Sequence, residues 1–229
     1  MKKNITILSA LTLLTCSLTF TSCKKDDITP PVVTMAGGDK TVSLGGTFTD
    51  PGASANDNKD GNISVTTTGS VDINHTGVYQ ITYSATDAAG NTGTAVRNVT
   101  VINDLDVMTG VYSCTVTTTG FSPTTYTQTI TASSTVNKRL IFGAFSDYYY
   151  YSGSAKTGAL NTIFADVSNT GVTSPINLPS QTAIQVGQTP TDRTFAGSGA
   201  RSSATTFGLS YTETTSAGTA NTTDVFVKQ

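Results

Sequence analysis

After the first 30 residues, apolar and polar residues alternate over short stretches, the period-two pattern of half-buried strands. The clearest strand covers residues 79–85, whose apolar side chains fall on one face, and a second follows over residues 92–102. In the turn between them, we expect Asp87 to accept backbone N–H groups and Gly90 to take a positive φ. The alternating pattern therefore predicts a first β domain at residues 31–103.

The second half of the chain also predicts strands joined by short turns, with no helical period. The expected strands are residues 111–119, 126–132, 139–145, 162–167, 183–186, 194–199, 205–212 and 223–227. Consecutive strands with short connections favour an antiparallel meander, either closed into a barrel or left half-closed, as in small calycin-type barrels. We place this second domain at residues 104–229.

The N-terminus breaks this pattern. Lys2 and Lys3 precede an apolar stretch over residues 5–20, small residues follow, and the chain then becomes abruptly polar. A basic start, a short apolar stretch and small residues at its end are typical of a secretory signal peptide. The stretch is short and rich in Thr and Ser, so it is a poor membrane-spanning helix.

Cys23 directly follows these small residues, with Ser22 before it. The arrangement resembles the signal of bacterial lipoproteins, in which the cysteine sulfur receives a diacylglyceryl group and begins the mature chain. This resemblance implies a signal peptide over residues 1–22, acyl chains such as palmitate on Cys23, and a polar tether over residues 23–30. Two or three acyl chains would hold the protein firmly to a lipid bilayer. An ordinary cleaved signal peptide, or an uncleaved anchor, with a chance cysteine is the alternative.

Two lysines and two aspartates, Lys24 to Asp27, come next. They resemble the Lys-then-acid tetrapeptides of surface-exported lipoproteins of the Bacteroidetes. The resemblance implies an outer-membrane lipoprotein exposed at the cell surface. A solvated charged tether explains the same residues without export.

Composition supports an all-β protein and limits its partners. Thr accounts for 46 of the 229 residues, and β-branched and turn residues dominate over straight-chain helix formers. Without the signal peptide, 11 Lys and Arg remain against 15 acids, a net charge near −4. No basic patch could neutralise phosphates, so no nucleic-acid partner is expected. With Cys23 lipidated, Cys114 is expected to be a small buried residue without a disulfide partner.

Four motifs of the first domain occur in a characteristic order. They are Thr-Phe-Thr-Asp-Pro-Gly-Ala at 47–53, Asp57 with Asp60-Gly61, Gly-Val-Tyr at 77–79, and Tyr-Ser-Ala-Thr-Asp-Ala-Ala-Gly-Asn at 83–91. Together they resemble the bacterial Ig-like domain that also occurs in pesticidal crystal proteins and in many surface lipoproteins. The resemblance covers residues 31–103 and implies an Ig-like β-sandwich that serves as a spacer or adhesive module.

The second domain carries softer signatures, at residues 136–142, 178–182, 195–199 and 208–212. Their order is similar to that in C-terminal lipocalin-like domains of Bacteroidetes lipoproteins. The resemblance implies a lipocalin-like antiparallel β domain after the sandwich.

One turn has the outline of a calcium loop. Asn56, Asn58 and Asp60 stand at alternate positions before Gly61, as in the D-x-[DN]-x-[DN]-G pattern. The first ligand is Asn rather than Asp, and Thr67 stands where a bidentate Glu is needed. Because strands rather than helices flank the motif, a plain Asx-Gly turn is the preferred interpretation. These three residues remain weak calcium candidates, and no metal or other cofactor is expected.

Four consecutive tyrosines, Tyr148, Tyr149, Tyr150 and Tyr151, are the most conspicuous local feature of the second domain. On a strand they place two rings on each face. One pair could fill the barrel while the other stacks on a sugar ring or a partner protein, because tyrosine combines a large apolar area with a polar tip. The alternative is that all four are core and edge aromatics.

No catalytic constellation is recognisable. His75 is the only histidine and lies in the first domain, and no G-x-S-x-G elbow appears. The sequence therefore predicts a non-catalytic, membrane-anchored surface lipoprotein that acts in binding or adhesion. A carbohydrate (a glycan) or another surface ligand such as a surface protein is the leading partner. The alternative is a structural spacer or a subunit of a cell-envelope assembly.

Overall fold

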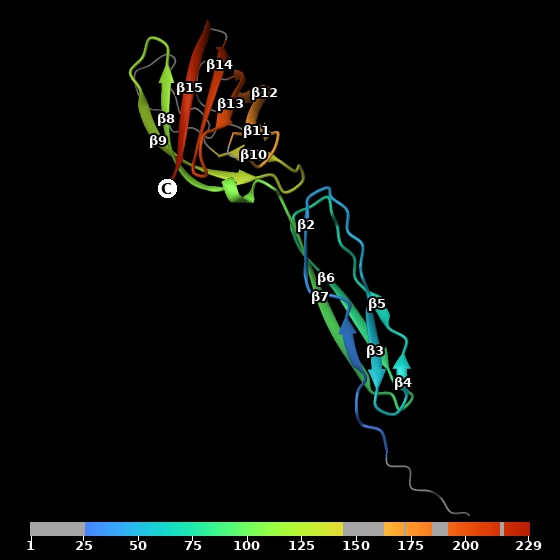
Figure 1. Ribbon diagram of the computed structural model, residues 1–229. Helices are drawn as coiled ribbons and strands as arrows, with labels where there is room; N and C mark the ends of the chain where they lie inside the picture. The colour runs from blue at the N-terminus through green and yellow to red at the C-terminus, as the bar shows by residue number, and fades with distance from the viewer. Residues whose placement is uncertain (1–25, 144–162, 172, 185–191, 216–217) are drawn as a thin grey trace, which may run out of the picture.

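The computed structural model describes residues 26–143, 163–171, 173–184, 192–215 and 218–229. The described strands form two units that lie end to end, a β-sandwich of β1–β7 and a closed barrel of β8–β15 (Figure 1). The predicted all-β class is confirmed. A short 3-10 helix, η1 (Asp106–Met108), lies between the units. Within the described ranges, no helix has the length and apolar character needed to cross a bilayer.

The sandwich consists of two sheets, with strand orders β1-β3-β4 and β2-β7-β6-β5. Its strands are β1 (Val32–Met35), β2 (Lys40–Ser43), β3 (Ala53–Asp57), β4 (Gly61–Ile63), β5 (Thr66–Thr68), β6 (Gly77–Thr86) and β7 (Thr92–Ile102). β2 runs parallel to β7, and the other pairs are antiparallel. These two sheets form the predicted Ig-like sandwich.

The apolar core of the sandwich is small. Ile81, Tyr83 and Val99 are buried, and half-buried apolar residues of both sheets pack against them. The guanidinium of Arg97 is fully buried beside this core and pairs with Asp50 at 2.8 Å. The hydroxyl of Tyr83 donates to the same carboxylate at 2.5 Å. The aspartate of the 47–53 motif therefore neutralises a buried cation, which would otherwise be strongly destabilising.

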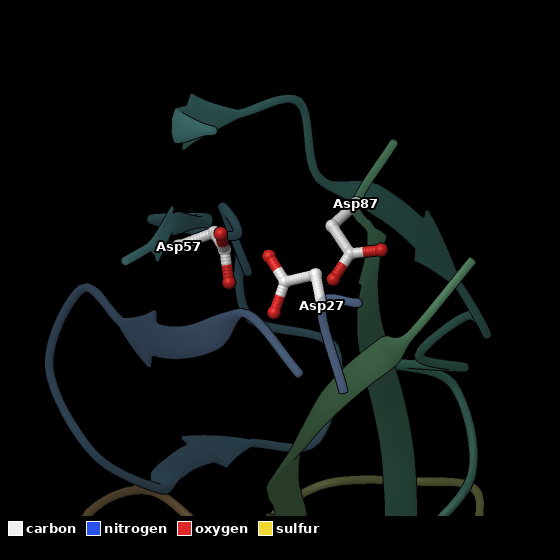
Figure 2. A group of neighbouring side chains, drawn as sticks. All are labelled: Asp27, Asp57 and Asp87. Atoms are coloured by element: carbon white, nitrogen blue, oxygen red, sulfur yellow. The ribbon is translucent and has the colours of Figure 1, made fainter. Parts of the chain in front are cut away.

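Two turns lie side by side at the end of the sandwich where the N-terminal segment enters (Figure 1). The backbone amide of Ala88, in the β6–β7 turn, donates to the carboxylate of Asp60 in the β3–β4 turn at 2.7 Å. In the β6–β7 turn, Asp87 accepts the backbone amide of Asn91 at 2.8 Å and Gly90 has a φ of +94°, as predicted. Figure 2 shows three aspartates at this end of the sandwich.

The barrel is a meander in which each described strand pairs antiparallel with the next, and β15 pairs with β8 to close it. Its strands are β8 (Gly110–Thr118), β9 (Thr124–Ala132), β10 (Arg139–Phe142), β11 (Ile163–Val167), β12 (Pro175–Ile184), β13 (Asp192–Arg201), β14 (Thr206–Thr215) and β15 (Gly218–Lys228). Closure decides between the two predicted forms, barrel and half-barrel.

Aromatic side chains fill the barrel at the end next to the sandwich. The ring of Phe207 stacks on that of Phe226 with centroids 4.4 Å apart, and the ring of Tyr112 meets Phe207 edge-on at 5.5 Å. The hydroxyl of Tyr112 donates to the carbonyl of Met108 at 2.7 Å, so η1 is bonded to this end of the core. Side chains fill this part of the interior, as an eight-stranded barrel allows.

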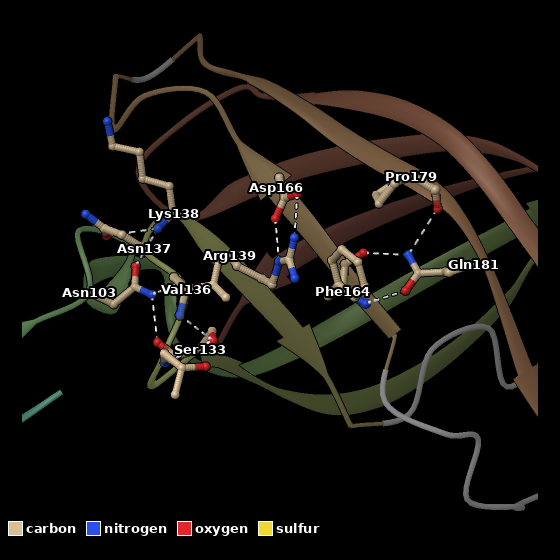
Figure 3. Close-up of polar contacts among 11 residues, drawn as sticks. Asn103, Ser133, Val136, Asn137, Lys138, Arg139, Phe164, Asp166, Pro179 and Gln181 are labelled. Carbon is tan, nitrogen blue, oxygen red and sulfur yellow. Dashed lines mark hydrogen bonds and ion pairs between the residues drawn. The ribbon is translucent and has the colours of Figure 1, made fainter. Parts of the chain in front are cut away.

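β12 is longer than the sequence predicted. The prediction placed a strand at residues 183–186, of which 185–186 lie outside the described residues, whereas β12 begins at Pro175 and includes two prolines, which lack the N–H groups of a sheet ladder. In the structure, the register to β13 shifts between Leu178 and Gln181, which forms an irregularity at Pro179. The side chain of Gln181 donates to the Phe164 carbonyl at 2.7 Å and accepts the Phe164 amide at 3.0 Å (Figure 3). A side chain thus supplies sheet hydrogen bonds beside the proline.

Candidate functional site

The three weak calcium candidates each have a different environment. Asn56 donates to the side chain of Asn62 across β3 and β4 at 3.0 Å. Asn58 is exposed, and Asp60 accepts the backbone amide of Ala88 at 2.7 Å. The calcium prediction for these three residues stays a prediction.

A different acidic residue, which the motif skips, faces inward. Successive side chains of a strand point to opposite faces, so Asp57 at the end of β3 is buried. Carboxylate oxygens of Asp27, Asp57 and Asp87 lie within 4.8 Å of one another (Figure 2). Hydrogen bonds from the backbone amides of Asp60 and Lys59 lower the pKa of Asp57. Burial acts to raise the pKa of Asp87, but hydrogen bonds from Asn91 and its turn outweigh burial and lower it.

Two other sets of predicted residues lie outside the described part of the chain. They are the lipidation residue Cys23 and the aromatic run Tyr148, Tyr149, Tyr150 and Tyr151. Lipidation of the first and ligand binding by the second remain predictions.

The side chain of Asn103, at the junction of sandwich and barrel, is buried and makes four hydrogen bonds. Its side-chain nitrogen donates to the carbonyls of Ser133 and Val136 at 2.8 and 2.9 Å (Figure 3). Its side-chain oxygen accepts the amides of Leu105 and Lys138, both at 3.0 Å. One amide side chain therefore bonds the end of the sandwich to the β9–β10 turn of the barrel.

A second set of bonds supports the same junction. Asp104 and Asn137 are linked twice: the amide of Asp104 donates to the Asn137 side chain at 2.9 Å, and the Asn137 side chain donates back at 3.1 Å. The hydroxyl of Ser43 donates to Asp104 at 2.6 Å, and the amide of Thr76 donates to the Ser134 carbonyl at 2.9 Å. Groups from both units thus hold the barrel at the end of the sandwich opposite the N-terminal segment.

A shallow groove crosses β13, β14 and β15 on the barrel wall. It has a volume of about 280 Å³ and is lined by Ala196, Gly197, Ser210, Tyr211, Thr212, Asn221, Thr222 and Thr223. Ser210 and Thr223 exchange a hydroxyl hydrogen bond at 3.3 Å, and the Thr212 hydroxyl donates to Asn221 at 3.3 Å. Each hydroxyl keeps further hydrogen-bonding capacity for a ligand.

Gly197 lets β13 and β14 approach each other closely next to the groove. A Cβ atom at Gly197 would collide with the carbonyl oxygen of Ser210 and with the backbone of Tyr211, so only hydrogen fits there. Close approach of a neighbouring backbone is a typical reason for glycine inside a strand.

The barrel interior behind the groove is polar. Asp224 is fully buried, accepts the hydroxyl of Tyr211 at 3.1 Å, and has one carboxyl oxygen without a hydrogen-bond partner. Burial raises the pKa of Asp224 to about 8. Cys114 is also buried, which raises its pKa to about 12, while the side-chain amide of Gln128 donates to its sulfur at 3.3 Å. Cys114 is therefore the buried residue that the sequence predicted.

Residues 33–101 match the family model described as bacterial surface protein, Ig-like domain. The match covers the sandwich and less than half of the chain. It confirms the Ig-like part of the resemblance that the sequence motifs indicated. No curated protein matches the chain.

Two solved structures show weak similarity over most of the chain. One is the lipoprotein BT2262 from Bacteroides thetaiotaomicron, at 21% identity and a TM-score of 0.32, covering 87% of this chain and all of that one. The other holds CBM51-2 in complex with GlcNAc and INT domains from Clostridium perfringens ZmpB, at 14% identity and a TM-score of 0.27, covering 86% of this chain and 44% of that one. At such TM-scores, neither similarity supports a conclusion about function.

Proposed function

We propose that this protein is a non-catalytic lipoprotein of a bacterial outer membrane, exposed at the cell surface, whose barrel binds a carbohydrate. In this proposal Cys23 carries the acyl chains, residues 23–30 form the tether, and the Ig-like sandwich carries a lipocalin-like barrel at its far end. The domain limits at residues 31–103 and 104–229 belong to the same proposal.

The hydroxyl-lined groove on β13, β14 and β15 carries the binding proposal. Its side chains offer hydroxyl and amide groups, which suit a ligand rich in hydroxyl groups. Its volume of about 280 Å³ lies just below that of ordinary small-molecule sites, about 300–1,000 Å³. A groove of this size favours one or two sugar units of a longer glycan, lying open to solvent.

The position of the groove supports a role in display. The barrel lies at the opposite end of the sandwich from the N-terminal segment (Figure 1). The hydrogen bonds of Asn103 and Asp104 fix the barrel there. A lipid-anchored chain of this form would hold the groove away from the membrane.

One observation favours the alternative, a structural spacer or a subunit of an envelope assembly. Other strand pairs of the barrel carry cross-strand hydroxyl pairs on exposed faces, such as Thr115 with Thr125 and Thr182 with Thr194. Among the exposed large apolar side chains of the described residues, Phe121 is the one aromatic ring. A barrel wall covered by paired hydroxyl groups is compatible with a structural spacer as well as with a binding surface.

The test is an array screen of residues 24–229, which include every described strand, against glycans and host-matrix proteins. Thr223→Trp would fill the groove from an exposed strand position, and Thr127→Trp places the same ring on an exposed position of β9 as its matched control. A Tyr149→Ala/Tyr150→Ala variant tests the aromatic run in parallel. We expect specific glycan binding that Thr223→Trp abolishes and Thr127→Trp preserves.

Other outcomes separate the alternatives. Binding lost only in the tyrosine variant would move the site from the groove to that run. No binding by the well-folded protein would refute the carbohydrate proposal for the ligands tested and would favour the spacer.

A further inference from the structure

Three carboxylates meet where the N-terminal segment passes the tip of the sandwich. They come from Asp27 of that segment, Asp57 at the end of β3 and Asp87 in the β6–β7 turn, and their oxygens lie within 4.8 Å of one another. Asp27 lies between the other two in Figure 2. Asp57 and Asp87 are only 4% and 7% exposed. Like charges gathered this closely and shielded from water repel one another.

A second, independent observation indicates that the carboxylate of Asp57 lacks a partner. One of its oxygens accepts the backbone amides of Lys59 and Asp60 at 2.8 and 3.0 Å. Its other oxygen is buried and has no hydrogen-bond donor. A carboxylate oxygen that is out of contact with water normally has a partner, because leaving it unpaired is costly. This oxygen belongs to the carboxylate that faces Asp27 and Asp87.

The other two carboxylates are held in place by their surroundings. Asn91 donates its backbone amide to one oxygen of Asp87 and its side-chain nitrogen to the other, each at 2.8 Å. The same side-chain nitrogen donates to the backbone carbonyl of Asp27 at 3.0 Å. Asp27 also accepts the amide of Thr29 at 3.1 Å. The three groups are therefore positioned before any ligand arrives.

One cation lies at the rim of this cluster. The ammonium of Lys59 is 3.8 Å from Asp27, and its side chain is 46% exposed. An ion pair of this length and exposure contributes little. It leaves most of the negative charge of the three carboxylates uncompensated.

We propose that Asp27, Asp57 and Asp87 form a calcium site that fastens the N-terminal segment to the tip of the sandwich. Calcium takes six to eight oxygen ligands at about 2.3–2.6 Å, so opposite ligands lie about 4.6–5.2 Å apart. The three oxygens, all within 4.8 Å of one another, fit within this span. Magnesium demands near-ideal octahedral geometry and usually keeps several waters, so three protein carboxylates suit it less well. Zinc prefers nitrogen and sulfur ligands, which none of the three side chains offers.

Such a site would change how the sandwich is attached. Asp27 lies four positions after Cys23 and comes before the strands begin. With calcium bound, the segment after Asp27 is held against the β3–β4 and β6–β7 turns. Without calcium, the repulsion among the carboxylates favours its release. The site stands on its own residues and does not depend on the carbohydrate proposal or on lipidation.

The test is calorimetric titration of residues 24–229, freed of metal with EDTA, with CaCl₂ and separately with MgCl₂. We expect one calcium ion per chain, weaker binding of magnesium, and a rise in Tm with calcium. Hydrogen exchange of the Thr29 amide should slow when calcium is added. Asp57→Asn and Asp87→Asn keep the shape and an acceptor oxygen but should weaken calcium binding about tenfold or more.

Two further variants make the result decisive. Asp72→Asn is the matched control, since Asp72 accepts a turn amide, that of Asn74, at 2.9 Å but lies outside the cluster. Asp27→Asn changes a residue outside the strands, so it should weaken calcium binding without lowering the Tm of the metal-free protein. No heat and no change in Tm at about 10 mM CaCl₂, above the dissociation constants of extracellular calcium modules, would overturn the proposal. Equal affinity in Asp27→Asn, Asp57→Asn and the wild type would also overturn it.

Discussion

Asp224 makes the stability of the barrel depend on pH in an unusual direction. Its carboxyl group is fully buried on β15, and burial together with the charge of Glu213 raises its pKa from 3.8 to about 8, against the hydrogen bond from Tyr211. At neutral pH the folded protein therefore holds Asp224 in its neutral form. The unfolded chain, with an ordinary pKa near 3.8, has it ionised.

The direction and size of the effect follow from this difference. Between about pH 4 and pH 8 the folded state binds one proton more than the unfolded state, so rising pH favours unfolding. A single group contributes a slope of about 1.4 kcal/mol per pH unit. From pH 5 to pH 8 the barrel should lose on the order of 4 kcal/mol from this residue. Below about pH 4 both states are protonated and the loss is absent.

Asp224→Asn isolates the effect. Asparagine keeps the size of the side chain and an oxygen that can accept the Tyr211 hydroxyl, but it does not ionise. Urea unfolding of wild type and variant at pH 5, 6, 7 and 8 should give a falling stability for the wild type and a flatter curve for the variant. Tyr211→Phe removes the hydrogen bond that acts to lower the pKa of Asp224, so the decline in that variant should extend to higher pH. Parallel curves for wild type and Asp224→Asn would refute the reasoning, because they would mean that Asp224 is ionised in the folded state.

Three further predictions concern other buried polar groups. Asn103→Leu should lower the free energy of unfolding by about 3 kcal/mol, because backbone groups at the junction lose their partners; urea unfolding checks this, and an equal loss for the more exposed Asn98→Leu would contradict it. Asp50→Ala should destabilise the sandwich by about 3–5 kcal/mol, because it leaves a buried guanidinium unpaired. Thermal melting checks this, with the exposed Asp39→Ala as the control that should stay near wild type. Cys114 should resist thiol reagents at pH 8 until urea unfolds the barrel, since burial raises its pKa to about 12; fast labelling of the native protein would contradict that account.

The strands could be predicted where one face is apolar and the other polar. Residues 79–85 and 92–102 alternate clearly, and both fall within long strands of the sandwich. The Asp87 turn was predictable as well, because aspartate and glycine have specific roles in turns. β12 was missed over most of its length; its prolines lack the N–H groups of a sheet ladder, so they are poor indicators of a strand. The side chain of Gln181, which supplies hydrogen bonds there, becomes visible only once distant strands are paired.

The proposed calcium site lies at the turn that the calcium-loop motif indicates but uses other residues. The calcium-loop pattern takes alternate positions, Asn56, Asn58 and Asp60, as ligands. Asn56 and Asp57 are the last residues of a strand, where neighbouring side chains point to opposite faces. The pattern therefore selects the outward-facing Asn56 and skips the inward-facing Asp57. Asp27 could not be added from sequence, since only the fold brings the N-terminal segment to this turn.

Buried polar groups, more than apolar area, specify how the parts of this chain are connected. Seven apolar side chains of the sandwich are buried, and only three of them form its core cluster, so apolar burial alone supplies a limited surface to orient its two ends. At one end the Asn103 side chain makes three hydrogen bonds to the β9–β10 turn of the barrel, and at the other Asp57 and Asp87 face Asp27 of the N-terminal segment. Hydrogen bonds and ion contacts are directional, whereas apolar burial is not. Isosteric changes at either end, such as Asn103→Asp or Asp57→Asn, should therefore loosen one connection while the Ile81 core of the sandwich stays folded.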